Sequence, residues 1–144
     1  MTVISELTDP SSTALESINQ LLPQLSSKAS PITMERLSEL VGSGSTMIFI
    51  CTNEEAKIVG MLSLVIMKIP TGNKAWVEDV VVDQNARGQG LGKSLMDHAL
   101  AEAGKLGVKT IDLTSRPSRK NANRLYQSLG YRIRETNVYR RSVS

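Results

Sequence analysis

The sequence predicts an α+β fold with a mixed, mostly antiparallel sheet of six to seven strands and helices on both faces. Three observations predict this class. Short segments rich in β-branched residues are separated by turns, which is typical of strands, and four other segments carry apolar residues at helical spacing. Residues 57–69 are apolar on both alternating faces, which favours a central strand covered on both sides. A single helix is expected between the strands at 75–83 and 109–114. A right-handed crossover of this kind makes two neighbouring strands parallel.

The first 45 residues contain one short strand and two helices. Residues 3–7 are expected to form the strand, which Asp9 and Pro10 end. The hydroxyl residues at 11–13 are suited to cap a helix with an apolar stripe, and Pro23 kinks or shortens it. Thr33 is suited to cap a second helix, which the Gly-Ser segment 42–45 ends.

The middle of the chain predicts three consecutive strands. The segments TMIFICT (46–52) and KIVGMLSLVIMKI (57–69) are joined by a turn at 53–56. A second turn, PTGNK at 70–74, leads into the third strand at 75–83.

The last third predicts a helix, a strand, a helix and a hairpin. The first helix begins at Leu91 and presents one apolar stripe: Leu91, Leu95, Ala99, Ala103 and Leu106, widened by Met96 and Leu100. A strand at 109–114 follows, parallel to the strand at 75–83. A helix over 121–130 takes Gly130 as its C-cap. The segments 131–135 and 137–141 are expected to pair as two short strands.

Three glycines on alternate positions, Gly88, Gly90 and Gly92, join the strand at 75–83 to the helix that follows. A nucleotide P-loop would need its first glycine at 87, where Arg87 stands, and the Gly-x-Gly-x-x-Gly dinucleotide pattern also fails. Free amides and the helix dipole at a helix N-terminus favour an anion. One glycine suffices for a plain turn, so three favour a cradle for a pyrophosphate.

Composition limits the class of protein. At 144 residues with a net charge of +3, the chain is expected to be one domain over residues 1–144, cytoplasmic, with no secretory signal and no membrane span. Cys51 is expected to be a buried, inert thiol and His98 a surface residue, so no metal site is predicted. Most arginines lie in the last thirty residues. Their side chains are able to bind nucleic acid or a phosphorylated ligand, or to face solvent. Few aromatic residues accompany them, which argues against nucleic acid.

These residues resemble the GCN5-related N-acetyltransferases (GNATs). The family's signature for acetyl-coenzyme A, Arg/Gln-x-x-Gly-x-Gly/Ala between a strand and a helix, matches Arg87, Gly90 and Gly92. A second motif, a helix ending in Leu-Tyr followed by Gly-Phe/Tyr, matches Leu125, Tyr126, Gly130 and Tyr131. Each motif alone has middling specificity, but the two together, in the family's order, are specific.

The resemblance implies acetyl-coenzyme A as cofactor, bound in the gap where the strands at 75–83 and 109–114 splay apart. The backbone of Val80, Val81 and Val82 would pair with the pantetheine arm. The pyrophosphate would be held by residues 87–93: Arg87, Gly88, Gln89, Gly90, Leu91, Gly92 and Lys93. Tyr126 would protonate the departing thiolate. Many members carry a cofactor-contacting asparagine where this chain has Arg119, so Asn121 or Asn123 would replace it.

The general base is open among three carboxylates. Glu78 and Asp79 are consecutive in a strand and point to opposite faces, so at most one serves a given substrate directly. A partly buried carboxylate has a raised pKa and can take a proton from an ammonium. Glu78 is preferred because it is expected to share a face with Val80 and Val82. Asp112 on the next strand is a further candidate.

The expected reaction is direct attack of a primary amine on acetyl-coenzyme A in a ternary complex. A small-molecule acceptor is favoured, because WVEDVVV with GQGLGK is similar to the amino-sugar phosphate branch of the family. The arginines at 132, 134, 140 and 141 would then meet its phosphate. Alternatives are a non-catalytic acyl-coenzyme A sensor, a protein N-terminal or lysine acetyltransferase, and a nucleic-acid-binding module. A homodimer is a further alternative to a monomer, and neither nucleic acid nor a membrane is an expected partner.

Overall fold

The computed structural model describes all residues, 1–144. Backbone contacts divide the chain into two compact units, Met1–Leu113 and Thr114–Ser144. The expectation of one domain over residues 1–144 stays a prediction.

The first unit is built on a five-stranded sheet in the order β1-β2-β3-β4-β5. Its strands are β1 (Val3–Glu6), β2 (Thr46–Thr52), β3 (Ile58–Ile69), β4 (Gly72–Val82) and β5 (Thr110–Asp112). The first three pairings are antiparallel, and β4 pairs with β5 in parallel. The predicted mixed, mostly antiparallel sheet and its parallel pair are therefore confirmed, with β3 in the centre. The strand at 75–83 begins earlier than expected, because a tight turn at Pro70 and Thr71 lets it start at Gly72.

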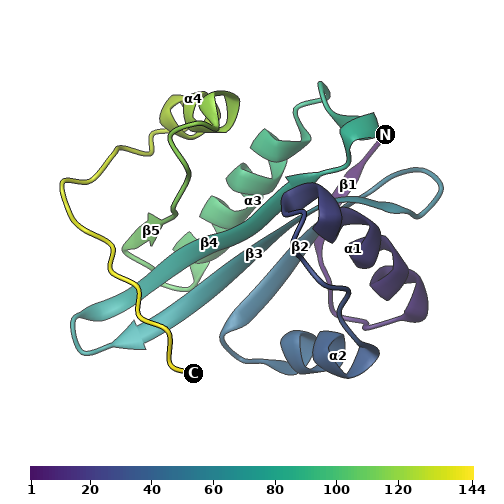
Figure 1. Ribbon diagram of the computed structural model, residues 1–144, viewed down its shortest axis with the longest axis horizontal. Helices are drawn as coiled ribbons and strands as arrows, with labels where there is room; N and C mark the ends of the chain where they lie inside the picture. Colours follow the sequence, from purple (N-terminus) through teal and green to yellow (C-terminus); the bar gives the residue numbers. More distant parts are fainter. The chain divides into compact units, whose positions relative to one another are not determined.

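Two helices cover one face of this sheet and a third covers the other (Figure 1). Helix α1 (Ser12–Leu25) is capped by Ser11, whose Oγ accepts the Ala14 amide at 3.1 Å. Helix α2 (Met34–Gly42) is capped in the same way by Thr33. Pro23 lies in the last turn of α1 and does not end the helix early. These caps confirm the predicted starts of both helices.

The core under α1 and α2 consists of aliphatic side chains from both helices and from the sheet. Leu21 and Leu37 are 1% and 0% exposed and pack with residues of β2, β3 and β4, among them Ile50, Met61 and Val81. Because this core joins α1 and α2 to three strands, the helices are fixed relative to the C-terminal end of β4, where Val81 lies.

Helix α3 (Leu91–Lys105) packs on the opposite face. Its buried stripe is narrower than predicted, since Leu100 and Leu106 are exposed. The His98 ring lies edge-on to Phe49 with centroids 4.8 Å apart, so His98 is half-buried rather than a surface residue. Cys51 is fully buried, and burial raises the pKa of its thiol from 9.0 to about 11. The predicted burial of this thiol is confirmed.

The second unit contains one helix, α4 (Lys120–Ser128). Gly130 follows it with a φ of +96°, and the Tyr131 amide donates to the Tyr126 carbonyl, which is the predicted glycine-terminated helix end. The predicted hairpin at 131–141 is wrong, because this segment has no regular secondary structure. The sheet therefore has five strands rather than six to seven. Ile133 is 88% exposed, and the turn residues include no glycine, so the segment offers little that stabilises an isolated hairpin.

The middle of β4 contains a β-bulge. Met61 pairs with Val81, whereas Ser63 pairs with Glu78, so two steps along β3 match three steps along β4. Asp79 sits in this extra step with a φ of +51°, in the left-handed region. A single additional residue thus interrupts the alternation of side chains along the strand.

The bulge changes which residues share a face. Directly paired residues lie on the same face of a sheet, and so do residues two apart on β3. Glu78 therefore lies on the α1–α2 face together with Val81, while Val82, which pairs with Gly60, lies on the α3 face. The expectation that Glu78 shares a face with Val80 and Val82 is wrong, because alternation was counted through a bulge.

The positive φ at Asp79 predicts an unusual order of stabilities. Asp79→Val is expected to lower the free energy of unfolding by about 1–2 kcal/mol, because a β-branched side chain is strained in the left-handed region. Asp79→Gly is expected to equal or exceed wild type by up to about 1 kcal/mol. Glu78→Val, at an exposed neighbour without positive φ, is the matched control and is expected to change stability by less than about 0.5 kcal/mol. Urea unfolding measures all three; equal stability of Asp79→Val and Glu78→Val would argue against the bulge.

Candidate functional site

Strands β4 and β5 separate after three residue pairs. Lys74, Ala75 and Trp76 pair with Thr110, Ile111 and Asp112, and β4 then continues to Val82 with no strand beside it on that edge. The predicted splay of the parallel pair is confirmed. Residues 77–82, including the predicted cofactor strand Val80–Val82, therefore present an open backbone edge, which an extended ligand can pair with.

A tight loop connects the end of β4 to α3. Asp83 begins it: its Oδ1 accepts the Asn85 amide at 3.2 Å and its carbonyl accepts the Ala86 amide at 2.8 Å, which closes a short 3₁₀ turn at Gln84–Ala86. Arg87 Nε donates to the Val82 carbonyl at 3.4 Å. These bonds fold the loop back on the end of β4. Residues 83–93 are called the coenzyme loop below, after the role that the family resemblance implies for them.

The second half of the coenzyme loop carries a row of free backbone donors. No amide from Arg87 to Lys93 donates to a backbone or side-chain acceptor of the chain, and the first bond of α3 is that of Ser94 to Gly90 at 3.0 Å. Most of these residues are exposed, and they open a helix of 15 residues. The Lys93 ammonium pairs with the Asp97 carboxylate at 2.8 Å, so the backbone amide of Lys93 is its free donor in this loop. Free donors at a helix N-terminus fit a diphosphate.

The backbone conformation of the turn explains why two of the three positions carry glycine. Gly88 and Gly90 have φ values of +83° and +74°, where other residues are strained, and a Cβ at either position would meet no atom within 4 Å. The glycines at these positions are thus explained by the turn itself. The observation that points to an anion is the row of free amides rather than the glycine spacing.

Gln24, in the last turn of α1, fastens the start of the coenzyme loop. Its Oε1 accepts the Gln84 amide at 2.9 Å, and its Nε2 lies 3.5 Å from Asp83 Oδ1 and 3.3 Å from the Gln20 carbonyl. Sequence reasoning missed Gln24, because nothing in the local pattern indicates a contact with residues about sixty positions away.

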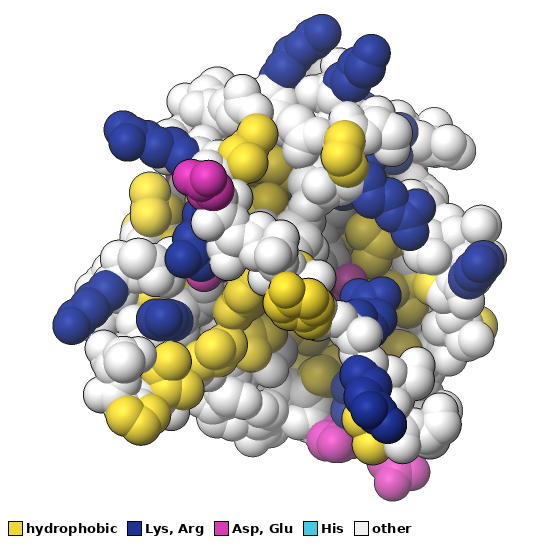
Figure 2. Space-filling model, turned by 60° about the vertical axis from the view of Figure 1, so that its left-hand side comes forward, with side chains coloured by type: hydrophobic (Ala, Val, Ile, Leu, Met, Phe, Trp, Pro, Cys, Tyr) yellow, Lys and Arg dark blue, Asp and Glu magenta, His cyan; other side chains and the backbone are white.

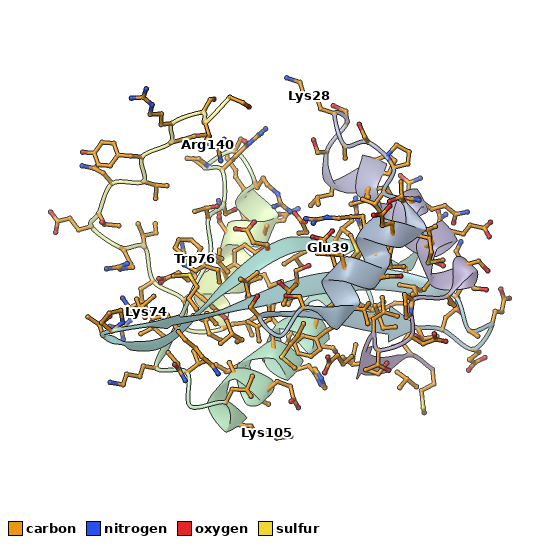
Figure 3. All side chains as sticks on the ribbon, turned by 90° about the horizontal axis from the view of Figure 1, so that it is seen from below. Lys28, Glu39, Lys74, Trp76, Lys105 and Arg140 are labelled. Carbon is orange, nitrogen blue, oxygen red and sulfur yellow. The ribbon has the colours of Figure 1, made fainter.

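Three carboxylates occupy the region where β4 and β5 separate. Glu78 and Asp79 are both exposed, so the expectation of a partly buried Glu78 is not met. Asp112 is half-buried and pairs in register with Trp76. By the pairing of β3, β4 and β5, Glu78, Trp76 and Asp112 share the face on the side of α1 and α2. Figure 3 shows Trp76 on this side of the sheet and Lys105, on α3, on the other.

The predicted residues of the second unit lie on or next to α4. Tyr126 is 7% exposed, and its ring lies edge-on to Tyr131 with centroids 6.4 Å apart. Asn123 Nδ2 donates to the Arg116 carbonyl at 3.0 Å and thereby holds the turn before the helix. Asn121 is exposed and its side chain makes no hydrogen bond, and Arg119 occupies the N-cap without a side-chain cap.

Positive charge is concentrated in the second unit. Residues 114–144 hold eight of the 17 Lys and Arg and one of the 14 Asp and Glu. The arginines at 132, 134, 140 and 141 are all exposed. On the face drawn in Figure 2, Lys and Arg side chains clearly outnumber Asp and Glu. The chain therefore offers several cations to an anionic ligand.

No group of three or more His, Cys, Asp or Glu side chains is placed to hold a metal ion. None of the helices is long and apolar enough to cross a membrane.

Comparison with known proteins identifies the family. The model of the acetyltransferase (GNAT) family matches residues 15–131. An uncharacterised N-acetyltransferase of Bacillus subtilis, YhdJ, is 32% identical over 111 residues, which cover 76% of this chain and 78% of that protein. The ribosomal protein bS18-alanine N-acetyltransferase of Escherichia coli is 39% identical over 59 residues, 41% of this chain and 40% of that protein.

Solved structures agree with this match. The glucosamine-6-phosphate N-acetyltransferase of Arabidopsis thaliana superimposes with a TM-score of 0.81 and 25% identity, over 98% of both chains. One conclusion follows from the separation of β4 and β5, the loop that connects β4 to α3, and the match to the family model. The chain belongs to the GNAT family and is an acetyl-coenzyme A-dependent N-acetyltransferase.

Proposed function

We propose that this protein transfers the acetyl group of acetyl-coenzyme A to the primary amine of a small, phosphate-bearing molecule such as an amino-sugar phosphate. The amine attacks directly in a ternary complex. The observation that carries the proposal is the arrangement of β4: exposed carboxylates stand at its bulge, its edge is open beyond Trp76, and its end leads to a row of free amides. One strand thus connects a surface suited to an ammonium with a surface suited to a diphosphate.

The coenzyme is held by main-chain groups in this proposal. The amides of Gly88, Gln89, Gly90, Leu91, Gly92 and Lys93, with Arg87, bind the pyrophosphate, and the backbone of Val80–Val82 pairs with the pantetheine arm. Asn121 is proposed as the cofactor-contacting asparagine in preference to Asn123. The reason is that Asn123 already uses its amide group to hold the Arg116 carbonyl, whereas the Asn121 side chain makes no hydrogen bond.

Glu78 is proposed as the general base. An acceptor amine arrives as an ammonium ion and must lose a proton before it attacks. Glu78 is exposed, and it shares its face of the sheet with Trp76 and Asp112, so an amine on this face meets two carboxylates and an aromatic ring. Asp79 sits in the bulge, and Asp112 is half-buried. Glu78 is therefore the most accessible proton acceptor on that face.

Tyr126 is proposed as the general acid. The thioester of acetyl-coenzyme A supplies a thiolate leaving group, and a tyrosine hydroxyl is able to protonate it. The family position of Tyr126, a helix end in Leu-Tyr closed by Gly130, supports this role. An amide of the open β4 edge supplies the hydrogen bond that stabilises the developing oxyanion.

The class of acceptor is supported by a relative and by charge. The Arabidopsis thaliana structure, which is named for glucosamine 6-phosphate, matches nearly the whole chain. Exposed arginines at 132, 134, 140 and 141 supply cations for a phosphate. The Escherichia coli relative named for the alanine of ribosomal protein bS18 favours a second candidate, acetylation of a protein N-terminus, but its match covers less of this chain.

A panel of amines tests the acceptor class. Thiol release from acetyl-coenzyme A is measured with glucosamine 6-phosphate, with unphosphorylated glucosamine, with a polyamine and with a peptide that begins with alanine. The phosphorylated sugar is expected to exceed its matched unphosphorylated partner by roughly tenfold or more in kcat/KM, since a charge-assisted hydrogen bond is worth about 1.5–3 kcal/mol. A peptide that is the best substrate would establish the second candidate instead.

Two glycines of α3 provide a matched test of the coenzyme loop. Gly92→Asp adds a carboxylate among the free amides, and Gly104→Asp adds the same charge at the exposed far end of the same helix. Gly92→Asp is expected to raise the Kd for coenzyme A by about tenfold or more through like-charge repulsion. Its melting temperature is expected to be kept, because an acid in the first turn stabilises a helix by about 0.3–1 kcal/mol. Calorimetry that finds equal Kd values for the two variants would remove the coenzyme loop from the binding site.

The two chemical roles make a joint kinetic prediction. Tyr126→Phe is expected to lower kcat roughly 10²-fold and leave the Kd for coenzyme A nearly unchanged, with exposed Tyr139→Phe as its control. Glu78→Gln is expected to remove the acidic limb from the pH profile of kcat/KM, while Asp79→Asn keeps it. Wild-type turnover in Tyr126→Phe would reduce Tyr126 to a packing residue, and an unchanged pH profile in Glu78→Gln would exclude Glu78 as the base.

A further inference from the structure

We infer that Gln24 is a positioning residue for acetyl-coenzyme A: it holds the first residues of the coenzyme loop so that the free amides after them are presented in a fixed arrangement. The inference rests on the proposed role of this loop. Gln24 itself touches neither substrate nor reacting atoms in this account and acts through Asp83 and Gln84.

The contact is bidentate and links elements far apart in sequence. The side-chain amide of Gln24 accepts from the Gln84 amide at 2.9 Å through Oε1 and lies 3.5 Å from Asp83 Oδ1 through Nε2. These are the hydrogen bonds that join a helix of the α1–α2 layer to the coenzyme loop. Gln24 is half-buried, and the core under α1 fixes the helix on which it stands.

Asp83 is the point from which the loop is set. Its amide donates to the Val59 carbonyl of β3 at 2.8 Å, and its carboxylate also accepts the Asn85 amide. Gln24 adds a third constraint from a different layer of the fold. Its Oε1 is the acceptor for the backbone amide of Gln84. The 3₁₀ turn at Gln84–Ala86 passes directly into Arg87, where the row of free donors starts. Fixing Asp83 and Gln84 therefore limits the positions open to the donors that follow.

Fixing the donors before the ligand arrives favours binding. A diphosphate that must order a loose loop loses part of its binding energy to that ordering, and a pre-organised loop avoids the loss. The effect applies to coenzyme affinity and not to the chemical step, because Gln24 contacts the start of the loop only. A selective change in the Kd and KM for the coenzyme is the signature of this role, and a general loss of packing would not produce it.

The test compares Gln24→Met with Gln20→Met. Gln24→Met keeps the length of the side chain and removes its hydrogen bonds to Gln84 and Asp83, together with the one to the Gln20 carbonyl. Gln20→Met makes the same change one turn earlier on α1, at an exposed residue whose side chain makes no hydrogen bond and whose backbone the substitution leaves in place. Gln24→Met is expected to raise the Kd for coenzyme A by calorimetry, and the KM for acetyl-coenzyme A, about 5- to 10-fold with kcat within twofold. The Gln20→Met values are expected to match wild type.

Hydrogen exchange of the Gln84 amide adds a readout that needs no ligand. In Gln24→Met this amide is expected to exchange faster than in wild type and in Gln20→Met, while the amides in the middle of α1 keep their protection. If the wild-type protein binds coenzyme A and Gln24→Met has the same Kd and KM as wild type, the inference is overturned and the proposed function stays intact. Failure of the wild-type protein to bind coenzyme A would instead overturn the proposed function. A parallel fall in kcat and in melting temperature would make Gln24 a packing residue, which contradicts the positioning role.

Discussion

The extra residue at Asp79 in β4 determines which face of the sheet carries Glu78, the proposed general base. Without it, Glu78 would lie on the α3 face with Val80 and Val82, under a helix that covers that side. With it, Glu78 is turned to the α1–α2 face beside Trp76 and Asp112, and the strand still reaches the coenzyme loop. The cost is a non-glycine residue at φ +51°, which a short polar side chain such as aspartate tolerates better than most. A local strain of this kind is retained when the surrounding structure holds it in place, and here β3 supplies that support.

The coenzyme loop combines two requirements that one stretch of chain satisfies. The backbone must turn sharply between β4 and α3, and Gly88 and Gly90 allow this turn through their positive φ values. The amides from Arg87 to Lys93 must also remain without protein acceptors, and the helix that starts at Leu91 leaves them free. Contacts from Asp83, Arg87 and Gln24 fix the loop from its first half, so its second half is ordered without using the donors themselves. This separation of fixing bonds and free donors is what a pre-organised anion site requires.

Sequence reasoning predicted the features that depend on local chemistry. Ser11 and Thr33 as caps, Gly130 after α4, and the crossover that makes β4 and β5 parallel follow from short-range rules, and the structure has them. The bulge was missed because β4 is apolar on both faces after Asp79, so an extra residue leaves no visible break in its alternation. Gln24 was missed because its partners are about sixty residues away. The hairpin at 131–141 was overpredicted: its alternating pattern suits a strand, but in this structure Ile133 and Tyr139 are exposed and no strand pairs with the segment.

The most direct measurement follows the backbone amides of the isotopically labelled protein by NMR during titration with coenzyme A and, separately, with pantetheine, which has no pyrophosphate. Coenzyme A is expected to shift the amide resonances of residues 88–93, and pantetheine is expected to leave them in place while it shifts those of Val80–Val82. If saturation with coenzyme A leaves the resonances of residues 88–93 unmoved and shifts only another part of the chain, these amides do not bind the pyrophosphate.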